Sequence, residues 1–189
     1  MKKLITLLAF LILGTAIANA QAWETLPGKK MMDVHNILLK QGYQQTSNSD
    51  NDLAIYNKTS ATHYKVTLSI SPQSKIVNAV TVCERVFDTY LAAEKRYNEI
   101  KKEFTDKYNY VEDKNVMFHP YSATSPDQDK INALSTDKAD IFTLFQYDDE
   151  KYVNVSIGFD YDKSKVKIHY TYIDMAAREA FDKEKKEKQ

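Results

Sequence analysis

Residues 153–172 read VNVSIGFDYDKSKVKIHYTY, and this stretch decides the class of fold. Apolar side chains occupy every second position from Val153 onward, and the same pattern resumes at Val166 after a polar interruption. Such alternation is typical of strands that have one buried face and one face in water. The polar residues 162–165 between the two runs are typical of a turn. The stretch therefore predicts an antiparallel β-hairpin.

Further out along the chain, the same signals predict more strands and several helices. Alternation or a β-rich composition predicts four further strands, at residues 53–57, 64–70, 76–84 and 141–147. Apolar residues spaced three and four apart predict helices at 29–41, 88–108 and from 175 toward the end. Loops are expected at 44–51 and, apart from a strand fragment near 116–118, throughout 109–138. The result is an α+β fold, an antiparallel sheet of about six strands with helices on one face.

The predicted elements occur in a repeated order. A helix and three strands are followed by a second helix and three strands, which suggests a tandem α-β-β-β duplication over residues 29–84 and 85–174, with a helical tail at 175–189. This order resembles the tandem-repeat fold of the secreted β-lactamase inhibitor proteins. The likeness is one of element order alone, and no sequence motif carries it. It implies an architecture and no particular function.

Residues 1–20 have the three parts of a secretory signal peptide. Two lysines follow Met1, an uncharged apolar run comes next, and ANA at 18–20 supplies the small residues of a cleavage site. The apolar run is too short to span a bilayer, which needs about 20 residues. We expect a bacterial protein that is exported to the periplasm or beyond and is cleaved after Ala20. The mature chain, residues 21–189, is then a single domain without a transmembrane segment.

The mature chain is close to neutral and contains one cysteine. Two of the 26 lysines and arginines lie in the signal segment, which leaves 24 against 26 acidic residues, a formal charge of −2. Nucleic acid is not an expected partner, because binding it relies on a concentrated basic surface. Cys83 has no second cysteine for an internal disulfide, and its apolar neighbours predict a buried strand residue. A catalytic or intermolecular thiol is the alternative.

Local motifs for catalysis and metal binding are missing from the sequence. The histidines form no zinc-binding spacing, and the chain has no glycine-rich loop for a nucleophile or a phosphate. Residues 160–164, DYDKS, resemble the opening of a calcium loop but lack its glycine and its later glutamate, so a solvated hairpin turn is expected. We expect no cofactor, no metal and no local catalytic residues. Paired carboxylates far apart in the chain stay open as an alternative.

Tyrosine is frequent, with 13 in the chain. Five of them gather in the last three strands, namely Tyr147, Tyr152, Tyr161, Tyr170 and Tyr172. On one exposed face they would form a recognition surface, whereas on the opposite face they would fill the core under the helices. The sequence favours a non-enzymatic module that binds another protein or an envelope polymer through its sheet or its long loop. An envelope hydrolase with dispersed carboxylates and a carrier of a small ligand are the alternatives.

Overall fold

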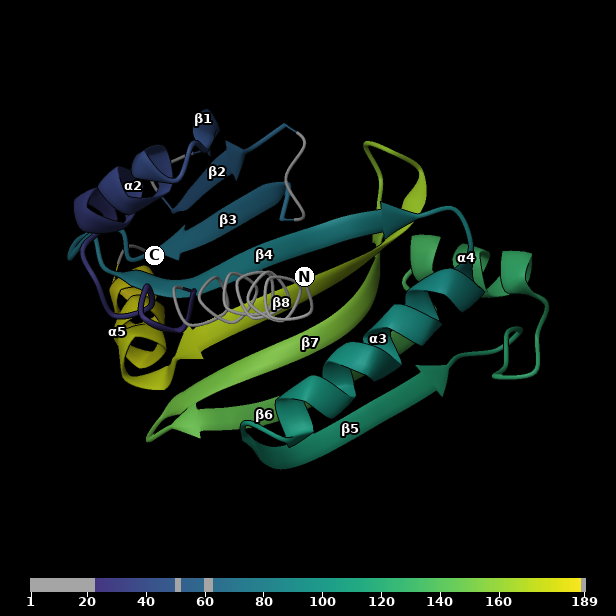
Figure 1. Ribbon diagram of the computed structural model, residues 1–189. Coiled ribbons are helices and arrows are strands. Elements are labelled where there is room, and N and C mark those ends of the chain that lie inside the picture. The colour runs from purple at the N-terminus through teal and green to yellow at the C-terminus, as the bar shows by residue number, and fades with distance from the viewer. Residues whose placement is uncertain (1–22, 50–51, 60–62, 188–189) are drawn as a thin grey trace, which may run out of the picture.

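A computed structural model describes residues 23–49, 52–59 and 63–187 of the chain. The expected signal segment, residues 1–20, lies outside these described residues. The described residues form a mixed helix and strand fold around one open antiparallel sheet, which confirms the α+β class (Figure 1).

The sheet has eight strands, so the expectation of about six was wrong. Its order is β1-β2-β3-β4-β8-β7-β6-β5. The strands are β1 (Gln44–Ser49), β2 (Leu53–Asn57), β3 (Lys65–Ile70), β4 (Val77–Phe87), β5 (Asn109–Met117), β6 (Ala139–Asp148), β7 (Lys151–Asp160) and β8 (Lys165–Asp174). The described helices are α2 (Met31–Lys40), α3 (Tyr90–Thr105), α4 (Asp127–Ser135) and α5 (Met175–Lys186).

The sequence failed to predict β1 and α4, and of β5 it predicted only the end, as the strand fragment near 116–118. Both strands lie at the edges of the sheet, so each pairs with one neighbour only. A strand at an edge can keep polar side chains on both faces, which removes the alternation that would reveal it. The segment 109–138 therefore contains a nine-residue strand and a nine-residue helix joined by the nine-residue loop 118–126, and it is not the continuous long loop expected.

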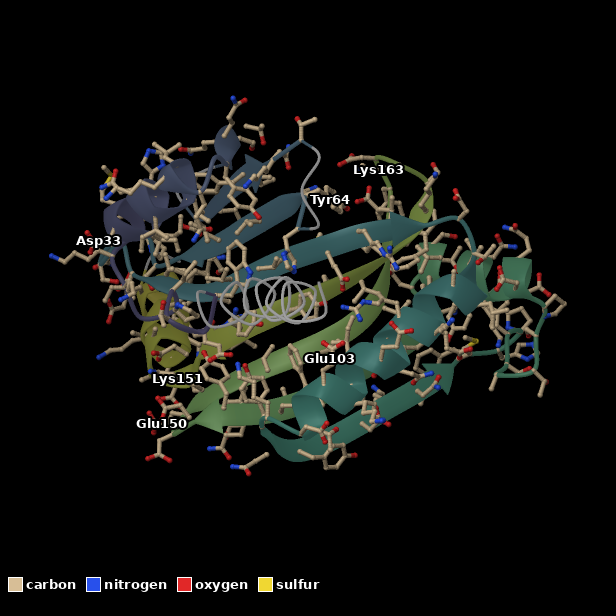
Figure 2. The ribbon with its side chains drawn as sticks, in the orientation of Figure 1. Asp33, Tyr64, Glu103, Glu150, Lys151 and Lys163 are labelled. Carbon is tan, nitrogen blue, oxygen red and sulfur yellow. The ribbon has the colours of Figure 1, made fainter. Side chains whose placement is uncertain are left out.

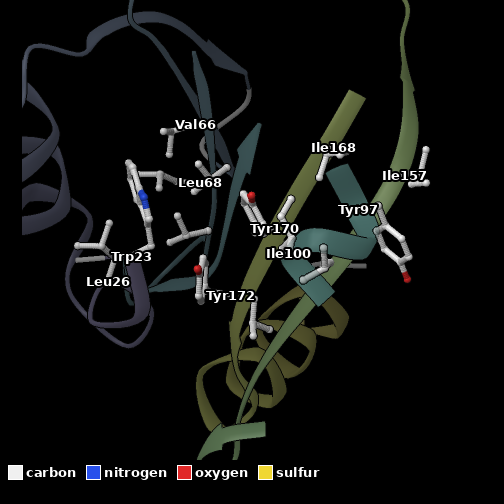
Figure 3. Packing of buried hydrophobic residues seen from close by; sticks show 14 of the residues in the cluster. Trp23, Leu26, Val66, Leu68, Tyr97, Ile100, Ile157, Ile168, Tyr170 and Tyr172 are labelled. Carbon is white, nitrogen blue, oxygen red and sulfur yellow. The ribbon is translucent and has the colours of Figure 1, made fainter. Parts of the chain in front are cut away.

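Three helices cover one side of the sheet, which we call the covered face. α2 lies over the first half of the sheet, and α3 packs over β4, β8, β7 and β6, with α4 beside α3 (Figure 1). Their buried side chains join those of the strands in a single cluster, part of which Figure 3 shows. The cluster includes Val34, Leu38, Tyr56, Val66, Leu68, Val80, Val82, Ile100, Phe104, Leu134, Phe145, Val153, Val155, Ile168, Tyr170 and Tyr172.

The expectation that all helices share one face was wrong for α5. This helix packs against β4 and β8, and its buried side chains Ala177 and Phe181 lie outside the main cluster. Ala79 of β4 points away from the covered face and is also buried outside that cluster. We call the side of the sheet opposite the covered face the open face, and α5 accounts for the burial at its β4 end.

Local hydrogen bonds fix the ends of the helices. Gly42 follows α2 with a φ of 85°, and the Tyr43 N–H donates to the Leu38 carbonyl at 3.0 Å. This left-handed glycine closes the helix at little steric cost. At the start of α3, the Thr89 hydroxyl caps the first turn, and the Asp127 carboxylate accepts the next backbone N–H groups at 3.0 and 2.7 Å. Asp127 thereby joins α4 to α3, which holds both helices over the second half of the sheet.

Candidate functional site

The five tyrosines singled out from the sequence do not form one exposed surface. Tyr170 and Tyr172 are buried on the covered face, and Tyr147 packs against the same cluster. Tyr152 sits between covered-face residues of β7 and therefore points to the open face. Tyr161 is 62% exposed in the β7–β8 turn, where its hydroxyl donates to the Ser135 carbonyl at 3.1 Å.

Rings on the covered face link the two halves of the sheet. Tyr170 stacks on Phe104 of α3 with centroids 5.7 Å apart, and on its other side lies His63, at 6.1 Å. His63 in turn lies 6.0 Å from Trp23. Figure 3 shows Trp23 on one side of Tyr170 and α3 on the other. The buried tyrosines therefore serve as packing between the halves.

A buried carboxylate sits under α3 in the same layer. Glu84 is 4% exposed, and its Oε1 accepts from Arg96 Nε at 2.9 Å. Its Oε2 accepts from the Tyr170 hydroxyl, a hydrogen bond that joins β4 to β8. Burial and then the nearby Glu84 charge raise the pKa of Tyr170 well above its ordinary range, so the hydroxyl keeps its proton. Both oxygens of Glu84 have partners, so the carboxylate joins β4 to α3 and to β8.

The open face has the features expected of a contact surface. Apart from Ala79 and Cys83, which are buried, most of the side chains in its middle are half-exposed, and they come from β2, β3, β4, β8, β7 and β6 in turn, so they extend across both halves. Two rows of paired residues cross the middle of the sheet from β2 or β3 to β6, and neither contains a charged group. The first row is Ile55, Thr67, Thr81, Thr171, Asn154 and Leu144. The second row is Ser69, Ala79, Ile173, Tyr152 and Gln146. The Thr81 and Thr171 hydroxyls bond each other at 3.1 Å across the junction of the halves.

Cys83 and His169 are cross-strand neighbours on the open face, next to these rows. The Cys83 thiol is buried, and burial raises its pKa, which disfavours the thiolate that a nucleophile needs. His169 Nδ1 is buried and has no hydrogen-bond partner among the described residues. A methyl group added at Gly158 would come within 3.1 Å of His169 Cε1, so the ring occupies space that the glycine leaves free. The pair is packed into the sheet, and its chemistry does not favour catalysis.

The folded protein is expected to lose stability in mild acid because of His169. Burial, and secondarily the charge of Lys167, lowers the pKa of His169 from 6.5 to about 4. Above pH 6.5 the imidazole is neutral in both folded and unfolded chains. Between pH 6.5 and 4 only the unfolded chain takes up the proton, so the free energy of unfolding falls by on the order of 2 kcal/mol. Urea denaturation at pH 7.0 and 4.5 measures this loss.

His169→Asn is expected to reduce the loss of stability between these two pH values. His119→Asn is the matched control, because His119 is exposed. An equal loss in the wild type and in His169→Asn would show that His169 is not the group responsible.

The DYDKS segment forms the β7–β8 turn, and its first carboxylate is already engaged. Asp160 is 4% exposed and accepts hydrogen bonds from the Tyr64 hydroxyl and from the Lys163 backbone N–H, the latter at 3.1 Å. Burial alone would raise the pKa of Asp160, but these donors outweigh it and the pKa is lowered. Within the described part of the chain, no group of three or more histidine, cysteine, aspartate or glutamate residues is placed to hold a metal ion.

Comparisons with known proteins add no assignment. No protein-family model, curated protein or solved structure matches this chain. None of the described helices is both long and apolar enough to cross a bilayer.

Proposed function

We propose that the mature chain, exported and cleaved after Ala20, is a non-enzymatic module that binds another protein through its open face. The single observation that carries this proposal is that α2, α3 and α4 leave that face of the eight-stranded sheet uncovered beyond the region of α5. An uncovered sheet face is unusual where it carries apolar side chains, and such surfaces commonly mark interaction sites.

The chemistry of the open face favours a protein partner over a charged polymer. The cores of protein interfaces are depleted of charged residues, and aromatic and other apolar residues are enriched there. The two central rows fit that description, because Ile55, Leu144, Ile173 and Tyr152 lie among threonines and amides with no charge between them. A polyanionic or polycationic partner would find no counter-charge in these rows.

The two halves of the sheet support the proposal, because they make the open face continuous. Each half begins with a helix, α2 or α3, and then supplies four strands, and the halves meet where β4 pairs with β8. We infer a tandem duplication with four strands in each unit, one more than the sequence pattern suggested. Joining two such units edge to edge gives one surface twice as wide as either unit would offer.

Arginine substitutions on the open face are expected to abolish partner capture. Thr67→Arg and Leu144→Arg place a charge in the uncharged row, one in each half, and should lower recovery of a partner from an envelope extract at least tenfold. Leu91→Arg is the matched control, because Leu91 is 68% exposed on α3 on the other side of the protein. Quantitative pull-down with protein starting at Gln21 measures recovery, and thermal melting checks that each variant is folded.

Two outcomes of this experiment would refute the proposal. One is equal recovery by the wild type and both open-face variants. The other is a bound partner that survives protease treatment of the extract, since the partner would then be an envelope polymer.

A further inference from the structure

A pocket of about 350 Å³ lies where the β7–β8 turn passes the end of β2 and the start of β3. It is therefore built from both halves of the sheet. The lining residues are Asn57, Lys58, Thr59, Tyr64, Lys65, Asp160, Asp162 and Lys163. Figure 2 shows Tyr64 from the first half and Lys163 from the second close together at this end of the sheet. The volume falls at the lower end of the range of small-molecule sites, about 300–1,000 Å³.

Three lysines line this pocket, and two of them have no carboxylate partner among the described residues. Lys163 Nζ lies over the Tyr64 ring, 3.7 Å from its centroid. Lys58 Nζ donates to the Gln41 carbonyl at 2.7 Å, which satisfies one of its three N–H groups, and it lies over the Tyr43 ring, 5.5 Å from its centroid. The third lysine, Lys65, pairs weakly with Asp162 at 3.5 Å.

The carboxylates of the pocket offset this positive charge only in part, because three lysines and two aspartates in the lining leave a formal charge of +1. Asp160 keeps its negative charge, and its oxygens accept hydrogen bonds from the Tyr64 hydroxyl and the Lys163 backbone N–H. Asp162 has a side chain that is 82% exposed, where water screens its charge. The lining thus presents donors on both sides of the seam between the halves.

We infer that this pocket binds a small anionic ligand, a molecule that carries a carboxylate or a phosphate group. Lys58 and Lys163 supply positive charge from the first and second halves, and Lys163 Nζ, which lies over the Tyr64 ring of the lining, donates a hydrogen bond to the oxygens of the anion. Charge-assisted bonds of this kind strengthen where the pocket wall displaces water. This site is separate from the uncharged rows of the open face. The inference of an anion site can therefore be tested independently of the proposed protein partner.

Three sugars of similar size test the inference, namely glucose 6-phosphate, glucuronate and neutral glucose. Isothermal titration uses the form starting at Gln21, in 50 mM NaCl, with each sugar up to 10 mM. At least one of the two charged sugars is expected to bind, and glucose is not. Whichever charged sugar binds more tightly shows whether the pocket prefers a phosphate or a carboxylate. Raising NaCl to 500 mM should weaken binding several-fold, because the interaction is between charges.

Lysine variants locate the binding. Lys58→Gln and Lys163→Gln should each weaken the affinity about threefold and together about tenfold, whereas Lys102→Gln, on the exposed surface of α3, should leave it unchanged. Thermal melting verifies folding, and the single variants suffice if the double variant melts below the assay temperature. The inference is overturned if no charged sugar binds at 10 mM, if glucose binds equally well, or if both lysine variants bind like the wild type.

Discussion

Replacing Phe145 with alanine is expected to lower the free energy of unfolding by about 3–5 kcal/mol, the largest effect of any single change we consider. Phe145 is fully buried in the middle of β6 and packs edge-on against Phe104 of α3, with ring centroids 5.8 Å apart. Truncation removes the ring's transfer free energy and leaves a cavity between the sheet and α3. That cavity cannot collapse easily, because β6 is held by strands on both sides.

Urea denaturation measures this loss, and Tyr110→Ala provides the control. Tyr110 lies opposite Phe145 on β5 but is 53% exposed, so its truncation should cost less than about 1 kcal/mol. A similar loss of unfolding free energy in both variants would mean that α3 does not bury this part of the covered face. An unchanged slope of the urea transition should accompany the shifted midpoint, since the surface exposed on unfolding stays nearly the same.

Replacing Glu84 with alanine is expected to cost about 3 kcal/mol. The substitution leaves the Tyr170 hydroxyl buried without an acceptor and removes the closest counter-ion of Arg96. The cost stays below the top of the range for buried pairs, because Arg96 also contacts Glu99 and Glu103, each at 3.3 Å. Urea denaturation at pH 7 measures this cost.

Two further variants separate the contributions to that cost. Tyr170→Phe removes only the hydroxyl and should cost about 1 kcal/mol. Arg178→Ala breaks an exposed ion pair with Asp182 on α5 and should cost less than about 0.5 kcal/mol. If Glu84→Ala proved no more costly than Arg178→Ala, the buried network would contribute nothing to the junction of the halves.

The sequence predicted best the elements whose side chains alternate between core and water. β7 and β8 are central strands with one buried face, so Val153, Val155, Ile168 and Tyr170 reveal both their type and their orientation. β5 could not be found in this way, because all but its last residue are exposed. Its apolar and polar residues therefore do not alternate between the core and water. α4 is short, and it is stabilised by contacts with α3 and with the sheet. The sequence pattern does not show these contacts.

The candidate sites could be predicted only in part, because they depend on strand register. The sequence alone did not reveal that Tyr152 pairs with Ile173 and so faces away from Tyr172. It also could not bring Tyr64 to Asp160, which is 96 positions later in the chain. The DYDKS segment was noticed, but its neighbours from the first half were not. A one-residue change of register would place every one of these side chains on the opposite face.

The pairing of β4 with β8 has a consequence for the order of folding. Thr81 and Thr171 meet across that junction although 90 positions separate them. Contacts of such high sequence separation form late, because the chain between them must first lose its freedom. β4, the last strand of the first half, cannot pair with β8 until β8 is present. Until then β4 has an unpaired edge that can pair with other chains. Acquisition of the native state is thus expected to be a single late event that waits for the whole chain.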